Sequence, residues 1–443
     1  MSSPDLFATY LPQLKILFKQ GSRVCVGFSG GLDSVVLLDC LHRLQDIEYY
    51  KLFAIHVNHQ LSPNANSWAQ FCTDFCARKN IPLQIETVNI AGDHASGIEA
   101  AARDARHGVF KKQTTNFIAL AHHADDQAET LLLLLLRGAG VKGASAMPLL
   151  QKKNPLTGMP AIVRPLLEVT RIELEQYATQ RGLKWISDES NADIRYDRNY
   201  MRHEVMPQIE KRFPAYRVTF GRAAQHFAEA SALLDELAAM DVKAAMLEDQ
   251  LSQAWLMQLS KARAKNLLRY FLARHGVRMP QAARLDDLVR QLQSSGYDAE
   301  VCVELGRHEV RAWRGRIYLL PIAPPDAAVN MRWNGETEIK LTPLMGVLKF
   351  VLTTGQGVSV SKLSSGAVTV RSRSGGETLQ LAANRPRRTL KNLLQESEVP
   401  PWERERLPLL FYGDRLVWVP GIGVDINFQA VSGEAGYSVD WVR

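Results

Sequence analysis

Short apolar runs alternate with longer amphipathic segments between about residues 22 and 187. The runs have the length of strands, and the longer segments repeat their apolar residues at helical spacing. This alternation is typical of βαβ units, which build a parallel sheet with helices on both faces. The predicted strands are 24–28, 52–57, 83–88, 117–121 and 162–166, and the predicted helices are 34–45, 66–79, 98–113, 126–137 and 170–181.

The hydrophobic pattern changes after about residue 217. Its spacing is helical throughout to about 293, and two strand-like pieces follow at 301–305 and 316–320. Beyond about 330, short strand-like runs are separated by glycine-containing turns. We therefore predict three domains: an α/β domain over 1–216, a helical domain over 217–325, and a small β-rich or α+β domain over 326–443.

Composition, charge and cysteine content indicate the class of protein and its compartment. The charged fraction of 22% and the hydrophobic fraction of 46% are ordinary for globular proteins, and the net charge of +7 is compatible with a polyanionic partner. The longest apolar run, 131–136, is far too short to cross a membrane. No export signal begins the chain, and its five cysteines form no Cys-x-x-Cys pair. We expect a cytoplasmic protein without membrane contact.

A loop of six residues joins the first predicted strand to the first predicted helix. Its sequence is Ser29, Gly30, Gly31, Leu32, Asp33 and Ser34. The glycines allow close approach of an anion, and the helix amides and hydroxyls donate to phosphate oxygens. Asp33 would repel phosphate unless it held a cation, so its natural role is to bind Mg²⁺. The alternative is a tight turn with Asp33 as a helix-start residue. We predict a phosphate-binding site with Mg²⁺ at these six residues.

A second polar group follows the fourth predicted strand. His122 precedes a helix on which Asp126 and Glu129 are three residues apart and so share one face. These carboxylates can bind an amine, hold Mg²⁺ or accept a proton, and His122 can act as acid or base. The alternative is that Asp126 only complements the helix dipole. Because carboxyl ends of parallel strands share one crevice, we expect this group to face the glycine loop.

Basic and aromatic residues suggest further contacts. Arg103 and Arg106 share a helix face and suit a carboxylate or a phosphate, although a solvated face is equally consistent. A turn-rich stretch near residue 200 suits a phosphate backbone and stacked bases. Its candidate residues are Tyr196, Arg198, Asn199 and Arg202, and Arg387 and Arg388 offer later phosphate contacts, although an isolated surface arginine is more often solvated.

The glycine loop resembles the PP-loop of the ATP pyrophosphatase superfamily, which has an adenine nucleotide α-hydrolase-like fold. With His-Val-Asn-His at 56–59, Ala-His-His-x-x-Asp-Gln-x-Glu-Thr at 121–130 and Tyr-x-Arg-Asn-x-x-Arg at 196–202, the chain resembles the tRNA(Ile)-lysidine synthetase family. Ala139 and Ala144 depart from the family pattern, which puts only local packing in doubt. The resemblance covers the first domain thoroughly and extends to the later ones.

The resemblance implies a two-step reaction. ATP adenylates the C2 carbonyl oxygen of the wobble cytidine in tRNA(Ile) with a CAU anticodon, and the ε-amine of free L-lysine then displaces AMP. It implies that Asp33, His122, Asp126 and Glu129 are catalytic. The lysine would be bound by Asp126, Glu129, Arg103 and Arg106, and the tRNA by Tyr196, Arg198, Asn199, Arg202, Arg387 and Arg388. No obligatory protein partner is expected.

Two other functions are less consistent with the sequence. A PP-loop enzyme that thiolates tRNA normally needs reactive cysteines near its site, but Cys25 and Cys40 fall in apolar runs, and Cys72 and Cys76 share one helix face without partners. A non-enzymatic RNA-binding module with a degenerate nucleotide loop would not need the carboxylates of Asp33, Asp126 and Glu129, which are all present. The enzyme reading is therefore favoured.

Overall fold

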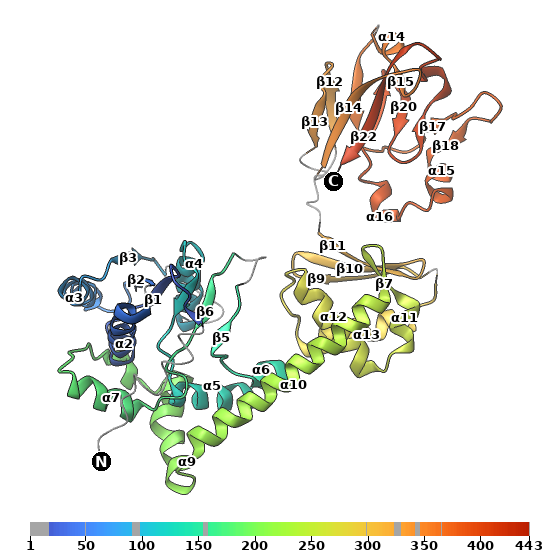
Figure 1. Ribbon diagram of the computed structural model, residues 1–443. Helices are drawn as coiled ribbons and strands as arrows, with labels where there is room; N and C mark the ends of the chain where they lie inside the picture. Colours follow the sequence, from blue (N-terminus) through green and yellow to red (C-terminus); the bar gives the residue numbers. More distant parts are fainter. Residues whose placement is uncertain are drawn as a thin grey trace. The chain divides into compact units, whose positions relative to one another are not determined.

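The computed structural model describes residues 17–48, 50–90, 98–153, 158–297, 299–322, 329–341, 346–364 and 366–442. Two compact units divide the chain (Figure 1): residues 1–244 with 262–279, and residues 245–261 with 280–443. The bounds of the three predicted domains stay predictions. None of the helices in the described ranges is long and apolar enough to cross a membrane.

The first unit is built on a six-stranded sheet in the order β3-β2-β1-β4-β6-β5. Neighbours are parallel except β5, which runs antiparallel to β6. The strands are β1 (Arg23–Gly27), β2 (Lys51–Asn58), β3 (Leu83–Thr87), β4 (Phe117–Ala119), β5 (Leu150–Gln151) and β6 (Ala161–Val163). The helices are α2 (Leu32–Glu48), α3 (Ala65–Arg78), α4 (Ile98–Lys111), α5 (Ala124–Leu136), α6 (Val141–Ala144) and α7 (Arg171–Gln180). The predicted α/β fold is confirmed.

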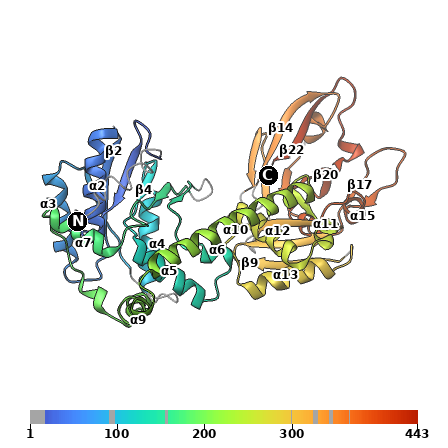
Figure 2. The ribbon, with the colours of Figure 1, turned by 60° about the horizontal axis from the view of Figure 1, so that its bottom comes forward.

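Strand alternation explains why helices cover both faces of this sheet. Val24 and Val26 point to one face and pack with residues of α2, α3 and α7. Cys25, between them, points to the other face and packs against Val109 and Phe110 of α4. Figure 2 shows α2 and α4 beside different parts of the sheet. The carboxyl ends of β1 and β4 therefore lead into the loops that carry the residues predicted for the site.

The chain after the sheet is more helical than predicted. The predicted turn-rich stretch near residue 200 forms α8 (Asp197–Tyr200) and a π-helical turn (Met201–Val205), after a 3₁₀ turn (Glu189–Ala192). They lead into α9 (Met206–Arg212) and α10 (Tyr216–Ala245), and α12 (Lys261–Arg274) follows later. Met206 and Tyr216 pack against Ala128 of α5. This packing brings residues 197–205 to the acidic face of α5.

The second unit contains a five-stranded sheet in the order β7-β8-β11-β10-β9 and the C-terminal β-rich region. Its first part comprises β7 (Met246–Leu247), β8 (Gln250–Ser252), α11 (Gln253–Gln258), α13 (Ala282–Ser294), β9 (Val301–Leu305), β10 (His308–Trp313) and β11 (Arg316–Pro321). Strands β9 and β11 match the two predicted pieces, whereas β10 was not predicted. The predicted order of a helical region followed by a β-rich region is confirmed.

The C-terminal region has two sheets, β12-β16-β19-β20-β21 and β13-β14-β22-β15, and the pair β17-β18. The strands are β12 (Asn330–Trp333), β13 (Glu338–Leu341), β14 (Gly346–Thr354), β15 (Val358–Ser359), β16 (Val368–Arg371), β17 (Thr378–Leu379), β18 (Arg388–Thr389), β19 (Leu409–Tyr412), β20 (Arg415–Val419), β21 (Gly423–Val424) and β22 (Ala435–Val442). The helices are α14 (Val360–Leu363), α15 (Leu390–Glu396) and α16 (Pro401–Arg404), with a 3₁₀ turn at Ile426–Phe428. Trp333, Phe350 and Val370 belong to a core that both sheets share.

A buried carboxylate fixes α7 against α2. Asp39 lies 2.7 Å from Lys79 Nζ, accepts a 2.7 Å hydrogen bond from the Tyr177 hydroxyl, and lies 3.3 Å from Arg181 Nε. Burial alone would raise the pKa of Asp39, but the hydrogen bonds and the positive charges outweigh it and lower that pKa. The ion pairs thus hold α7 in position beside the glycine loop.

We predict that Asp39→Asn lowers the free energy of unfolding at pH 7 by about 3 kcal/mol, because it leaves partly buried cations without their partner. The folded-state pKa lies below the unfolded value of about 3.9, so the carboxylate stabilises the fold above that pH. This contribution is lost as the pH falls through the folded pKa. Urea denaturation of both proteins should show a difference that shrinks toward pH 3. A difference that stays constant down to that pH would contradict the role of the charge.

Candidate active site

The glycine loop joins β1 to α2 and presents hydroxyl and amide donors. The hydroxyls of Ser29 and Ser34 lie 3.1 Å apart, and the Ser34 hydroxyl donates to the Gly31 carbonyl at 2.9 Å. Helix α2 begins at Leu32, directly after the glycines, so its first amides face the loop without intrahelical partners. These donors and the positive end of the helix dipole suit phosphate oxygens.

A residue with a Cβ does not fit at the position of Gly30. Its φ of +83° is rarely adopted by residues with a Cβ, and an added Cβ would lie 2.5 Å from Ile186 Cδ1 and 3.1 Å from Cys72 Sγ. The Gly30 carbonyl also accepts a 2.9 Å hydrogen bond from the Ile186 amide, which connects the loop to the segment after α7. The loop is thus tied to the chain that leads into residues 197–205.

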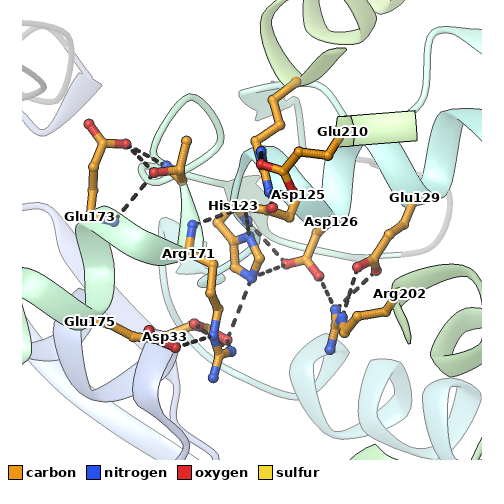
Figure 3. Close-up of polar contacts among 12 residues, drawn as sticks. Asp33, His123, Asp125, Asp126, Glu129, Arg171, Glu173, Glu175, Arg202 and Glu210 are labelled. Carbon is orange, nitrogen blue, oxygen red and sulfur yellow. Dashed lines mark hydrogen bonds and ion pairs between the residues drawn. The ribbon is translucent and has the colours of Figure 1, made fainter. Parts of the chain in front are cut away.

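Asp33 faces two cations. Arg171 Nη1 lies 3.2 Å from both of its carboxylate oxygens, and His123 Nε2 lies 3.8 Å from Oδ2 (Figure 3). Burial raises the pKa of Asp33 more than these two charges lower it. The described residues contain no cluster of three or more His, Cys, Asp or Glu that suits a metal ion. Carboxylate oxygens such as those of Asp33 are ligands that Mg²⁺ prefers, and the predicted role of Asp33 in binding Mg²⁺ stays a prediction.

His123, rather than the predicted His122, lies at the centre of the acidic group. Its ring nitrogens are 3.4 Å from Asp125 Oδ2 and 3.4 Å from Asp126 Oδ2, and Figure 3 shows the ring between these carboxylates and Asp33. Burial alone would lower the pKa of His123, but the carboxylates raise it. The carboxylates thus favour the protonated form of His123, and spacing alone did not distinguish His123 from its neighbour.

His122 has a different environment. Burial lowers the pKa of its imidazole to about 3, and the nearby charge of Asp126 does not compensate. His122 is therefore neutral at pH 7, which makes it a poor general acid. Its predicted catalytic role stays a prediction.

Asp126 and Glu129 share one buried face of α5, as predicted, and two arginines neutralise them. Arg198 lies 3.1 Å from each carboxylate, through Nη2 to Asp126 and Nε to Glu129. Arg202 Nη2 lies 3.0 Å from Asp126, and its Nε lies 2.8 Å from Glu129. The arginines predicted for tRNA thus pair with the acids predicted for lysine. Their side chains remain 31% exposed, so both can also meet a ligand.

Asp125 connects the helices around the crevice, and sequence reasoning did not single it out. Its carboxylate accepts a 2.9 Å hydrogen bond from the Arg171 amide and one from Arg217 Nε. Burial alone would raise the pKa of Asp125, but its hydrogen bonds lower it well below the ordinary value. A stable carboxylate at this position ties α5 to the starts of α7 and α10.

A basic cluster lies beside His122. Arg164 follows β6 and is only 7% exposed; its Nη1 donates to the Pro148 carbonyl at 2.8 Å, whereas its Nε has no hydrogen-bond partner among the described residues. Burial and the charge of Arg103 lower the pKa of Arg164 to about 10. Charges of Arg106 and Arg164 also act on His122. The charges of Arg103 and Arg106 of α4 are therefore felt in the region of the buried Arg164, and guanidinium groups suit an anion.

The remaining predicted tRNA contacts are spread over both units. Tyr196 is exposed, and Asn199 Nδ2 donates to the Asp193 carbonyl at 2.9 Å. In the second unit, Arg387 pairs with Asp425 at 2.9 Å, and Arg388 pairs with Glu396. Their contacts with tRNA stay predictions.

Sheet topology, the glycine loop and the crevice define an ATP-using enzyme of the PP-loop class. A PP-loop domain model matches residues 7–209, a TilS substrate binding domain model matches 251–318, and a TilS substrate C-terminal domain model matches 368–441. Similar proteins include the tRNA(Ile)-lysidine synthases of Nitrosomonas europaea (42% identity, covering 100% of this chain and 96% of that protein) and Coxiella burnetii (37%, 95% and 93%). The chain belongs to the tRNA(Ile)-lysidine synthase family.

We predict that Gly30→Ala weakens ATP binding roughly tenfold or more, because a Cβ at positive φ costs about 1–2 kcal/mol and this one also meets Ile186. Gly221→Ala is the control, since Gly221 lies within α10 with open space around its Cβ position. Calorimetric titration with ATP measures both variants. Equal affinity of Gly30→Ala and the unmodified protein would show that the loop tolerates a Cβ.

Proposed function

We propose that this enzyme ligates lysine to C2 of the wobble cytidine of tRNA(Ile) with a CAU anticodon and so forms lysidine. ATP is converted to AMP and pyrophosphate, and the new bond joins carbon to nitrogen. The observation that carries the proposal is that His123 lies beside both Asp33 of the glycine loop and Asp126 of the buried carboxylate pair, in a chain of this family. The product would read isoleucine codons in place of methionine codons.

In the first step, the C2 carbonyl oxygen of cytidine attacks the α-phosphorus of ATP, and pyrophosphate leaves. The loop amides and the hydroxyls of Ser29 and Ser34 orient the phosphates and stabilise the developing charge. Asp33 would hold Mg²⁺, which when bound neutralises charge on the leaving pyrophosphate. The adenylated carbon then carries a good leaving group in place of a carbonyl oxygen.

In the second step, the ε-amine of lysine attacks this carbon, and AMP leaves. Asp126 and Glu129 recognise the ammonium group. Each carboxylate has about four lone-pair sites, so the two arginines do not exhaust the acceptors. Burial alone would raise the pKa of Asp126, but the surrounding cations lower it, so this group binds the ammonium better than it removes a proton. The ammonium must lose a proton before attack; Glu129 is the candidate acceptor, with His122 assisting, and desolvation lowers the pKa of the amine and so favours that loss.

The basic cluster gives the other end of lysine a partner. Arg103 and Arg106 are the proposed ligands of the lysine carboxylate, because the charge of Arg106 acts on His122 and the charge of Arg103 acts on the buried Arg164. A guanidinium matches the two oxygens of a carboxylate. Acidic and basic groups at the two ends of one site would select a long diamino acid over simple amines.

Candidate contacts with the tRNA complete the proposal. Tyr196, Arg198, Asn199 and Arg202 are proposed to contact the anticodon region, and Arg387 and Arg388 to contact other phosphates of the tRNA. Arg198 and Arg202 would then bridge RNA and carboxylates. We further propose that the enzyme acts in the cytoplasm, with no obligatory protein partner.

Incubation with ATP, Mg²⁺, radiolabelled lysine and tRNA(Ile) bearing the CAU anticodon tests the proposed function. Label should enter this RNA, and it should not enter a matched tRNA with uridine at the wobble position. Absence of label from the cytidine-containing RNA, with ATP binding intact, would reject the lysidine assignment.

Asp126→Asn separates the two steps. The substitution preserves shape but removes a charge, and loss of a charge-assisted hydrogen bond of about 1.5–3 kcal/mol should raise the KM for lysine roughly tenfold or more. Pyrophosphate release in the absence of lysine should change by less than about threefold. Asp287→Asn is the control, because Asp287 forms an exposed ion pair in the second unit. Equal loss in both steps would refute the assignment of Asp126 to lysine.

A further inference from the structure

The glycine loop lacks a basic side chain of its own. Its six residues are serine, glycine, leucine and aspartate, so they offer amides and hydroxyls to a triphosphate but only one charge, which is negative. Pyrophosphate carries several negative charges, and Asp33 adds another beside it. Even with one divalent cation, an additional cationic group is needed for a balanced site.

Arg171 is held at this place by its backbone. It is the first residue of α7, and the helix starts with a capping box in which Thr170 and Glu173 bond each other's amides at 2.7 and 3.3 Å. Its own amide donates to Asp125 at 2.9 Å. The position of the arginine in the crevice is therefore set independently of what its side chain binds.

The side chain of Arg171 is available for a ligand. Its guanidinium contacts Asp33 through Nη1 at 3.2 Å and Glu175 through Nε at 3.2 Å, and it remains 41% exposed (Figure 3). An ion pair with this exposure is weak, so a more highly charged partner can replace Asp33. A guanidinium also presents paired donors that match phosphate oxygens.

We infer that Arg171 is a catalytic residue that binds the β- and γ-phosphates of ATP and holds pyrophosphate as it leaves. In the absence of nucleotide it neutralises Asp33. When ATP arrives, the guanidinium turns to the phosphates, and Asp33 becomes free to hold the cation. The inference rests on the proposed ATP step, but it requires neither lysine nor tRNA.

Three ligands distinguish phosphate binding from a purely structural role. The full-length protein is titrated calorimetrically with Mg·ATP, with inorganic pyrophosphate and with AMP, which lacks the β- and γ-phosphates. Arg171→Ala should weaken binding of ATP and pyrophosphate roughly tenfold or more and leave AMP binding within about twofold. Arg171→Lys should recover part of the loss, because it keeps the charge but not the paired donors.

Arg181→Ala is the matched control. Arg181 follows the same helix and pairs with Asp39 away from the loop, so its loss should not alter the selectivity between ATP and AMP. Arg171→Gln serves as a second variant if Arg171→Ala does not fold. An equal loss for all three ligands, or no loss for ATP and pyrophosphate, would overturn the inference. Failure of lysine incorporation would leave these binding results unchanged, so the two proposals fail separately.

Discussion

Burial of several carboxylates in one crevice is the constraint on which the rest of the catalytic unit depends. Asp33, Asp125 and Asp126 lie around the ring of His123. Glu129 is close by, because Arg202 pairs with both Glu129 and Asp126. Such charges are tolerated only when cations and hydrogen bonds compensate them. The cations come from α7, from residues 197–205 and from α10, so electrostatic balance fixes these elements around the sheet.

The same balance suits the proposed chemistry. Each carboxylate has a cationic partner in the absence of substrates, and each substrate brings charges of one or both signs. Phosphates attract guanidinium groups, and the lysine ammonium attracts carboxylates. Substrate binding can therefore exchange partners within the crevice without leaving a buried charge unpaired. The His123 ring contacts Asp33 on one side and Asp126 on the other. It therefore separates the proposed phosphate site from the proposed lysine site.

The sequence predicted those features that depend on local pattern. Strand and helix periodicity gave the parallel sheet, the glycine loop lay where a strand meets a helix, and three-residue spacing put Asp126 and Glu129 on one face. Short elements such as β5 were missed, because two residues carry no periodicity. Arg171 and Asp125 were missed, because their importance arises only where α5 and α7 meet. Arg198 and Arg202 were identified as basic, but only tertiary packing reveals their acidic partners.

The order of the two proposed steps is the central claim, and the α-phosphate of ATP reports on it most directly. The enzyme is incubated with tRNA(Ile) bearing the CAU anticodon and with ATP labelled at the α-phosphate, first without lysine and then with lysine. Label should enter the RNA in the first period and leave as AMP after lysine is added, in an amount equal to the lysine incorporated. Label that never enters the RNA, or that stays bound after lysine has been incorporated, would contradict the two-step site.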